Sequence, residues 1–309
     1  MRQTRHHMPP TMHTFEHQYL DLIRHILSTG VRRGDRTGTG TVAVHGSTIR
    51  CDLRNGAIPL LTTKRVAWKS VVAELLWFLD GGTNIRPLIE NNCHIWSDWP
   101  HAAYLKAHPD SGVTMGEFEK RILKDDEFAA QWGELGPVYG KQWRAWETPD
   151  GRTIDQVQEV IDLIRNNPES RRILWHAWNP AELDRMALPP CHLLYQFFVA
   201  DGELSLTLYQ RSVDVGLGLP FNLASAGALV HMMAKQTGLR PSELFWVGHD
   251  VHIYSNHETA LTQQTQRVIG QHPTLNIRGG VPSLFDYRPE DFTLTGYTPQ
   301  AAIPMDVAV

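Results

Sequence analysis

Apolar side chains recur at intervals of three and four residues in several parts of the chain, which is the pattern of amphipathic helices. One such run starts at Phe15 and stops before Gly30, a residue type that commonly ends a helix. The pattern predicts four principal helices, over residues 15–29, 68–79, 154–166 and 220–236. Residues 100–131 are polar and of mixed charge, and we expect them to form a peripheral helical insert.

Alternation of apolar and polar residues predicts the strands. Asp201 and Gly202 form a turn signal between two apolar runs, so these runs are expected to pair as a hairpin. We expect strands over residues 42–53 with an interruption at Gly46, and over residues 170–178, 193–199, 204–209 and 248–254. Because neither repeats nor a break in composition occur, the sequence predicts a single domain of mixed α and β structure over residues 14–309, after a disordered tail over residues 1–13.

Composition narrows the class of protein. The chain has 309 residues, of which 42% are hydrophobic and 20% charged, and no stretch approaches the roughly 20 apolar residues that span a membrane. A formal net charge of -4 argues against a general nucleic-acid surface. Three cysteines form an odd and sparse set without the spacing of metal ligands. Together with the lack of a signal peptide, they favour a reducing, cytoplasmic location and no bound metal.

Cys191 is the first candidate for chemistry. It follows Pro189 and Pro190, whose rings stiffen the backbone, and it stands at the start of an apolar strand. A thiol held in such a setting is well placed to act as a nucleophile. The alternative is a buried structural cysteine, since a free thiol often behaves as a small apolar group.

Glu74 lies within a strongly apolar helix, between Val71 and Phe78. If it points inward, loss of water should raise its pKa, as suits a general acid or base. The alternative is that the carboxylate points outward into solvent.

Several arginines are candidate anion ligands. Arg36 stands in a glycine-rich loop over residues 34–41, whose backbone N–H groups could hold an anion, although the spacing is not that of a Walker or dinucleotide-binding motif. Arg171 and Arg172 open a predicted strand, and Arg211 lies within the polar run over residues 210–214. The alternative is a plain polar loop for residues 34–41 and ordinary solvated side chains for Arg171 and Arg172.

Three further polar residues suit a planar ligand and a sugar. Asn222, near the start of a predicted helix, offers both a donor and an acceptor, or acts as a plain helix cap. His252 and Tyr254 alternate along one strand, so they share a face with their polar tips about 7 Å apart.

Taken in order, these motifs resemble the thymidylate synthase family, over residues 20–309. The resemblance is carried by DRTGTGT (35–41), TTKR (62–65), ELLWFL (74–79), LGPVYGKQWR (135–144), SRR (170–172), LPPCH (188–192), LYQRSVD (208–214), LGLPFN (217–222), DVHIYSNH (250–257) and the terminal VAV. It implies an α+β fold with a large twisted mixed sheet and flanking helices. It also implies a homodimer formed by packing sheet against sheet.

The resemblance implies covalent catalysis on dUMP. Cys191 would add to C6 of the uracil, with Arg211 supplying the nearby positive charge, and C5 would attack the methylene carbon of 5,10-methylenetetrahydrofolate. Glu74 would organise proton transfers through water. Tyr139 and His192 would assist removal of the C5 proton, and Asn222 would recognise N3–H and O4 of the ring.

The resemblance also implies binding sets. The residues expected to hold dUMP are Arg36, Gln210, Arg211, Ser212, Asp214, Asn222, His252 and Tyr254, with Arg171 and Arg172 reaching the phosphate in the partner subunit. The residues expected to hold the folate are Lys64, Trp96, Asp214, Phe221 and Ala308.

Two positions depart from the family pattern. His249 replaces an expected glycine before Asp250, and Ala226-Gly227 replaces an expected Tyr-Ala pair after Asn222. A compensating repack explains such a pair of changes, but an added imidazole and vacated space could also position water. Water in place of hydride would give 5-hydroxymethyl-dUMP and tetrahydrofolate, so a dUMP hydroxymethylase is the alternative reading. A non-catalytic nucleotide or RNA binder is the remote one, opposed by the presence of Cys191, Glu74 and Asn222.

Overall fold

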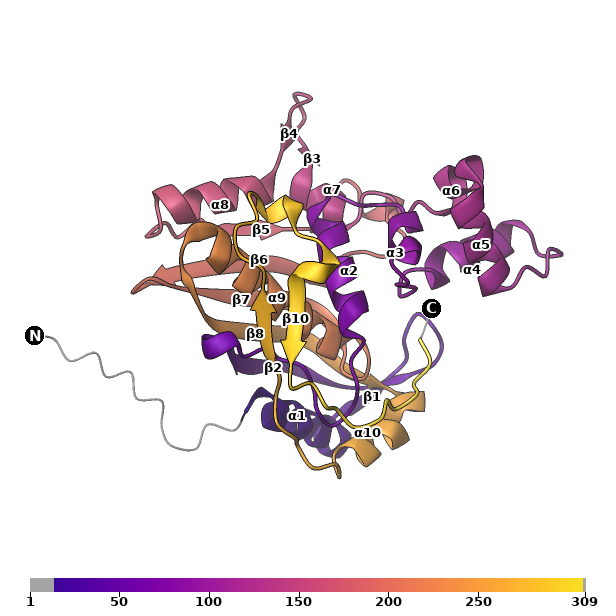
Figure 1. The fold of residues 1–309 in the computed structure, drawn as a ribbon. Coiled ribbons are helices and arrows are strands. Elements are labelled where there is room, and N and C mark those ends of the chain that lie inside the picture. The colour runs from indigo at the N-terminus through magenta and orange to yellow at the C-terminus, as the bar shows by residue number, and fades with distance from the viewer. Residues whose placement is uncertain (1–13, 308–309) are drawn as a thin grey trace, which may run out of the picture.

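A six-stranded mixed sheet forms the centre of the computed structural model, which describes residues 14–307 (Figure 1). The strand order is β1-β2-β8-β7-β6-β5, in which β7 and β8 run parallel and the other neighbours antiparallel. The strands are β1 (Val31–Arg33), β2 (Thr41–Asp52), β5 (Leu174–His176), β6 (His192–Ala200), β7 (Glu203–Asp214) and β8 (Arg240–Tyr254). Two small antiparallel pairs accompany them, β3 (Trp146–Glu147) with β4 (Thr153–Ile154) and β9 (Thr274–Ile277) with β10 (Phe292–Thr295). The expected α+β architecture with a large mixed sheet is confirmed.

The helices flank this sheet. They are α1 (Phe15–Thr29), α2 (Trp68–Leu79), α3 (Arg86–Glu90), α4 (Asp98–Ala107), α5 (Met115–Lys124), α6 (Asp126–Trp132), α7 (Tyr139–Arg144), α8 (Gln156–Asn166), α9 (Gly218–Thr237) and α10 (Glu258–Gln264). Helices α4, α5 and α6 lie together at the right-hand side of the view in Figure 1. None of the helices within residues 14–307 is long and apolar enough to cross a membrane.

Helix α9 packs on β7, β8 and α2 and is buried over nearly its whole length. Along β7 and β8, alternate side chains point toward this core, and the others remain partly accessible on the second face of the sheet. That second face carries apolar side chains, including Tyr209, Phe245 and Val247, and Phe198, which is 68% exposed. The single chain therefore leaves one sheet face incompletely covered.

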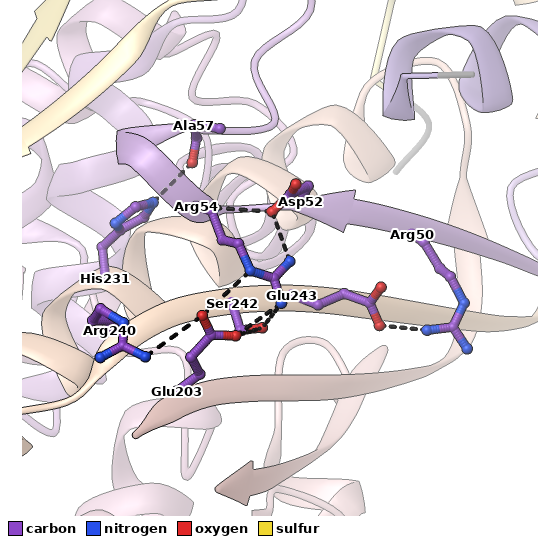
Figure 2. A network of polar contacts seen from close by, with 9 residues as sticks. All are labelled: Arg50, Asp52, Arg54, Ala57, Glu203, His231, Arg240, Ser242 and Glu243. Carbon is purple, nitrogen blue, oxygen red and sulfur yellow. Dashed lines mark hydrogen bonds and ion pairs between the residues drawn. The ribbon is translucent and has the colours of Figure 1, made fainter. Parts of the chain in front are cut away.

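A polar cluster joins the ends of three strands at one end of the sheet (Figure 2). Arg54 donates to Glu203 at 2.8 Å and to Asp52 at 3.1 Å, and Ser242 donates to the same Glu203 at 2.9 Å. Arg240 lies 3.8 Å from Glu203. These residues stand at the end of β2 and the starts of β7 and β8. The cluster therefore holds the three strands in register at the end of the sheet remote from Gln210.

One expected strand is wrong in extent. The expected strand over residues 170–178 forms only at β5, because Arg171 and Arg172 lie in a turn that precedes it. The predicted tail over residues 1–13 lies outside the described residues.

Candidate active site

Cys191 stands directly before β6, beside Arg211 of β7. The backbone N–H of Arg211 donates to the Cys191 carbonyl at 2.9 Å, and its guanidinium Nη2 lies 3.6 Å from Cys191 Sγ. The same guanidinium donates to the carbonyls of Pro190 at 2.7 Å and Pro189 at 2.9 Å. These two carbonyls hold the cation against the sulfur.

Two opposed effects act on the Cys191 thiol. Burial raises its pKa and the Arg211 charge lowers it, with a net pKa above the ordinary value. The free thiol therefore keeps its proton near neutral pH, and attack on an acceptor carbon requires that this proton leave.

Tyr139 and His192 form the wall behind the cysteine. The Cys191 N–H donates to Tyr139 Oη at 2.7 Å, and the Tyr139 ring stacks on His192 at 4.1 Å with an angle of 10°. His192 Nδ1 lies 2.8 Å from the hydroxyl of Tyr195. Burial lowers the pKa of His192 to about 3, so the imidazole is neutral at pH 7 and orients neighbours rather than carrying charge.

Glu74 points inward from α2, as the spacing predicted. Its residue is 6% exposed, and its Oε1 accepts a 2.7 Å hydrogen bond from Trp96 Nε1. Burial raises the pKa of Glu74 to about 7, although the Trp96 hydrogen bond acts in the opposite direction. A carboxyl group that titrates near neutral pH can both take and give protons.

Asn222 lies inside α9, so it is not the helix cap that the sequence left open. Its Oδ1 accepts from Gln210 Nε2 at 2.8 Å, and Gln210 Oε1 accepts from Trp246 Nε1 at 2.9 Å. An indole nitrogen only donates, which fixes the orientation of the Gln210 amide and in turn directs Asn222 Oδ1 toward Gln210.

The loop around Arg36 is held by the Asp35 carboxylate. Asp35 accepts from the backbone N–H of Thr37 at 2.9 Å and of Gly40 at 2.7 Å. Gly38 and Gly40 have φ of 77° and 79°, which a side chain would strain. The exposed Arg36 guanidinium is a neighbour of Tyr254, whose pKa burial raises to about 12 and the Arg36 charge pulls downward.

His252 and Tyr254 share a face near the end of β8, as expected, with their rings 5.2 Å apart in an edge-on arrangement. The register places His252 beside Asp214 of β7. His252 Nδ1 lies 3.1 Å from Asp250 Oδ1.

Asp214 is the centre of a second polar group. It accepts from the backbone N–H of Gly216 at 2.8 Å and of Leu217 at 3.0 Å, and it lies 3.6 Å from His257 Nδ1. Burial would raise its pKa, but the His257 contact and the backbone bonds lower it overall. Lys64 is buried against the same group, donating to the Gly216 carbonyl, and burial lowers its pKa to about 8.

The remaining predicted residues are placed as follows. Ser212 and Phe221 are half-buried at the ends of β7 and the start of α9, beside the residues already described. Arg171 and Arg172 are exposed in the turn before β5, at the opposite edge of the sheet from β1, and are not brought to Arg36 of the same chain. Ala308 lies outside the described residues.

The two departures from the family pattern do not meet. His249 is exposed on the partly accessible sheet face, with its ring 4.8 Å from that of His45. Ala226 is 1% exposed within α9, and a side chain at Gly227 would stand 2.6 Å from Pro59. The small residues allow close packing of α9 on the Pro59 segment, so they read as a repack of the core.

Sequence reasoning missed three residues that support the site: Trp246, His257 and Asp250. Trp246 and His257 act through side-chain contacts with β7, and Asp250 acts through contacts with Arg33 of β1 and His252 of β8. The alternation of polar residues on β8 was the one available signal for Asp250.

Comparison with known proteins shows the family of this chain. The family model described as thymidylate synthase matches residues 17–309. The chain belongs to the thymidylate synthase family. It is 53% identical over 295 residues to the thymidylate synthase of Cereibacter sphaeroides, covering 95% of this chain and 99% of that protein. Thymidylate synthases of Rhodopseudomonas palustris and Zymomonas mobilis are 52% and 51% identical over 295 residues, with the same coverage of both chains.

These relatives favour a methyltransferase that forms dTMP over a hydroxymethylase. The similarity extends over nearly the full length of each relative, and those proteins carry the name thymidylate synthase. His249 is exposed beside His45 and Ala226 is buried within α9, so the two positions do not combine into one altered pocket.

Proposed function

We propose that the protein converts dUMP and 5,10-methylenetetrahydrofolate to dTMP and dihydrofolate, with Cys191 as the covalent nucleophile. The contact that carries the proposal is the 3.6 Å approach of Arg211 to Cys191 Sγ, held by two proline carbonyls. The cation stabilises the thiolate as it forms, and the sulfur adds to C6 of the uracil. Electron density then moves to C5, which bonds to the one-carbon unit.

Glu74 and the groups beside Cys191 serve the proton transfers. With a pKa near 7, Glu74 exchanges protons with the pyrimidine through water. Tyr139 fixes the Cys191 backbone through its hydroxyl, and the neutral His192 stacked on it keeps that ring in place. Once C5 has bonded to the one-carbon unit, loss of the C5 proton allows the bond between this carbon and the folate nitrogen to break. Hydride from the tetrahydrofolate then forms the methyl group as the sulfur leaves C6 and the ring double bond returns.

The nucleotide is held by groups from four segments. Arg36, Arg211 and Ser212 bind the phosphate, Asn222 held by Gln210 reads N3–H and O4, and Tyr254 with His252 binds the deoxyribose hydroxyl. The charges of Arg36, Asp35, Asp214 and Cys191 all act on the Tyr254 hydroxyl, which supports one shared cavity for these groups.

The folate, as the second substrate, supplies both the carbon and the hydride. Trp96, Phe221 and Asp214 line its site. The Nε1 of Trp99 is buried without a hydrogen-bond partner within the described residues, which leaves a donor for a ligand beside Trp96. Lys64 reaches the glutamate tail only if its ammonium leaves the Gly216 carbonyl.

The active form is a homodimer that shares its sites. Two observations support this: the sheet face with exposed Phe198, and the exposed Arg171-Arg172 pair at the sheet edge away from Arg36. Packing two such faces together buries apolar area and allows the arginines of one chain to reach the phosphate bound by the other. The cytoplasm supplies both substrates and the reducing conditions that a free Cys191 needs.

A product assay tests the reaction. The protein is incubated with dUMP and methylenetetrahydrofolate, the pyrimidine is identified by mass spectrometry, and dihydrofolate is followed by absorbance. We expect dTMP and dihydrofolate in a ratio of one to one. 5-Hydroxymethyl-dUMP without dihydrofolate would replace the proposal with the hydroxymethylase, and His249→Gly should then move the product toward dTMP.

A further inference from the structure

Asp250 connects an arginine at the sheet edge to the imidazole of His252. Its Oδ2 accepts from Arg33 Nη1 at 2.7 Å, and its Oδ1 lies 3.1 Å from His252 Nδ1. Asp250 and His252 are two residues apart on β8, and their side chains are 32% and 11% exposed, respectively. Each carboxylate oxygen therefore contacts one neighbour, Oδ2 contacting Arg33 and Oδ1 contacting His252.

The contact between Asp250 Oδ1 and His252 Nδ1 determines which nitrogen of His252 carries the proton. An ionised carboxylate only accepts hydrogen bonds, so the neutral imidazole must present N–H at Nδ1. Its Nε2 then holds a lone pair and can only accept. Among the described residues, no side chain hydrogen-bonds to Nε2, so this acceptor is available to a ligand.

Tyr254 supplies the complementary group. Its ring lies edge-on to His252 at 5.2 Å, and burial keeps its hydroxyl protonated by raising its pKa to about 12. A ligand hydroxyl between the two can donate to His252 Nε2 and accept from Tyr254 O–H. A ligand that has only acceptors or no polar atom at this point leaves Nε2 unsatisfied.

We propose that Asp250 is a positioning residue that holds His252 as a hydrogen-bond acceptor, and so makes the site select a free 3′-hydroxyl on the nucleotide. The inference rests on the proposed function, in which His252 and Tyr254 bind the deoxyribose. Arg33 contributes to this arrangement, since it donates to Oδ2 and orients the carboxylate. The competing explanation is that Asp250 only ties β1 to β8 through Arg33.

A substrate that lacks the 3′-hydroxyl separates the two roles of Asp250. The value of kcat/KM is measured for dUMP and for 2′,3′-dideoxy-UMP, which lacks the hydroxyl, with the wild type and Asp250→Ala. We expect Asp250→Ala to lower kcat/KM for dUMP roughly tenfold, the scale of one hydrogen bond, and that for the dideoxy compound by less than about twofold. Equal loss on both nucleotides would overturn the proposal, because a structural defect does not depend on the ligand hydroxyl.

The control is Glu243→Gln, which breaks another arginine–carboxylate pair between β2 and β8, that of Arg50 and Glu243. It should leave the ratio of the two substrates unchanged; a shift as large as that of Asp250→Ala would overturn the proposal. If the wild type turns over dUMP but does not distinguish it from the dideoxy compound, His252 does not read the hydroxyl and the inference fails. Failure of the wild type to form dTMP would instead refute the proposed function itself.

The tautomer can also be observed without turnover. The ¹⁵N shifts of His252, assigned by their loss in His252→Gln, should show the proton on Nδ1 in the wild type at alkaline pH. In Asp250→Asn the single amide oxygen is claimed by Arg33, so the NH₂ group faces Nδ1 and the proton should move to Nε2. A wild-type proton on Nε2, or an unchanged pattern in Asp250→Asn, would overturn the proposal even if the Ala variant does not fold.

Discussion

Trp96 donates its indole N–H to Oε1 of Glu74 at 2.7 Å, and both side chains are buried. Segments 22 residues apart in the chain thus meet at one carboxyl group. A donor-only partner favours the ionised form of Glu74, yet burial outweighs it and the pKa stands at about 7. Near physiological pH, Glu74 is therefore present in both its protonated and its ionised form.

Glu74→Gln should lower kcat by about 10²–10⁴-fold, because the amide keeps the Trp96 hydrogen bond but cannot exchange protons. It should also change how stability depends on pH. With a pKa near 7 in the folded state against 4.5 ordinarily, the wild type loses stability as pH rises through this window, by on the order of 3 kcal/mol. Urea unfolding from pH 4.5 to 8 should therefore show that the stability of the Gln variant rises relative to that of the wild type as the pH increases.

Glu117→Gln serves as a control of opposite sign. Hydrogen bonds from Thr114 lower the pKa of this exposed carboxylate, so its contribution is present at neutral pH and lost as pH falls. That variant should be less stable than the wild type at pH 7, with a gap that closes in acid. A gap between wild type and Glu74→Gln that does not change with pH would refute the assigned pKa.

Asn222→Asp should shift the substrate preference from dUMP toward dCMP. One carboxylate oxygen replaces the amide NH₂ and can accept from the 4-amino group of cytosine, whereas O4 of uracil then meets an acceptor. We expect the ratio of kcat/KM for dUMP to that for dCMP to fall by at least about a hundredfold. Asn276→Asp on β9 is the control; an unaltered ratio in the Asn222 variant would place selectivity elsewhere.

Mixing Arg172→Ala chains with Cys191→Ser chains should restore activity. Each homodimer lacks one part of both sites, but a mixed dimer holds one site with a wild-type cysteine and a wild-type Arg172 from the partner. Recovery should approach one quarter of wild-type activity if chains mix at random, since half of the dimers carry one complete site. Full activity of a monomer at low concentration would contradict the shared site.

Much of the site could be predicted from the sequence, because its chemistry sits in short motifs. The proline-flanked Cys191 and the inward Glu74 were readable from their immediate neighbours. The support for Asn222 was not, since Gln210 and Trp246 stand 36 residues apart and meet only through the parallel pairing of β7 and β8. The strand expected over residues 170–178 failed because its first residues are charged and turn away before Leu174.

Arg54→Met should lower the free energy of unfolding by about 1–2 kcal/mol and leave kcat unchanged. The change removes the cation that joins Glu203 and Asp52 at the end of the sheet remote from Cys191 (Figure 2). Arg152→Met, which breaks a surface pair with Asp150 whose side chains are 70% and 59% exposed, should have a smaller effect. Equal effects in urea unfolding would show that the cluster adds nothing beyond a surface ion pair.

The covalent role of Cys191 is most directly tested by intact-mass spectrometry with a dUMP analogue that carries fluorine at C5. Fluorine cannot leave as the C5 proton does, so the reaction should stop after the one-carbon unit has joined the ring. The account predicts a chain heavier by the nucleotide plus the folate, with the added mass on the Cys191 peptide, and none in Cys191→Ser. An adduct on another residue, or dUMP turnover by Cys191→Ser above about a tenth of the wild-type rate, would contradict it.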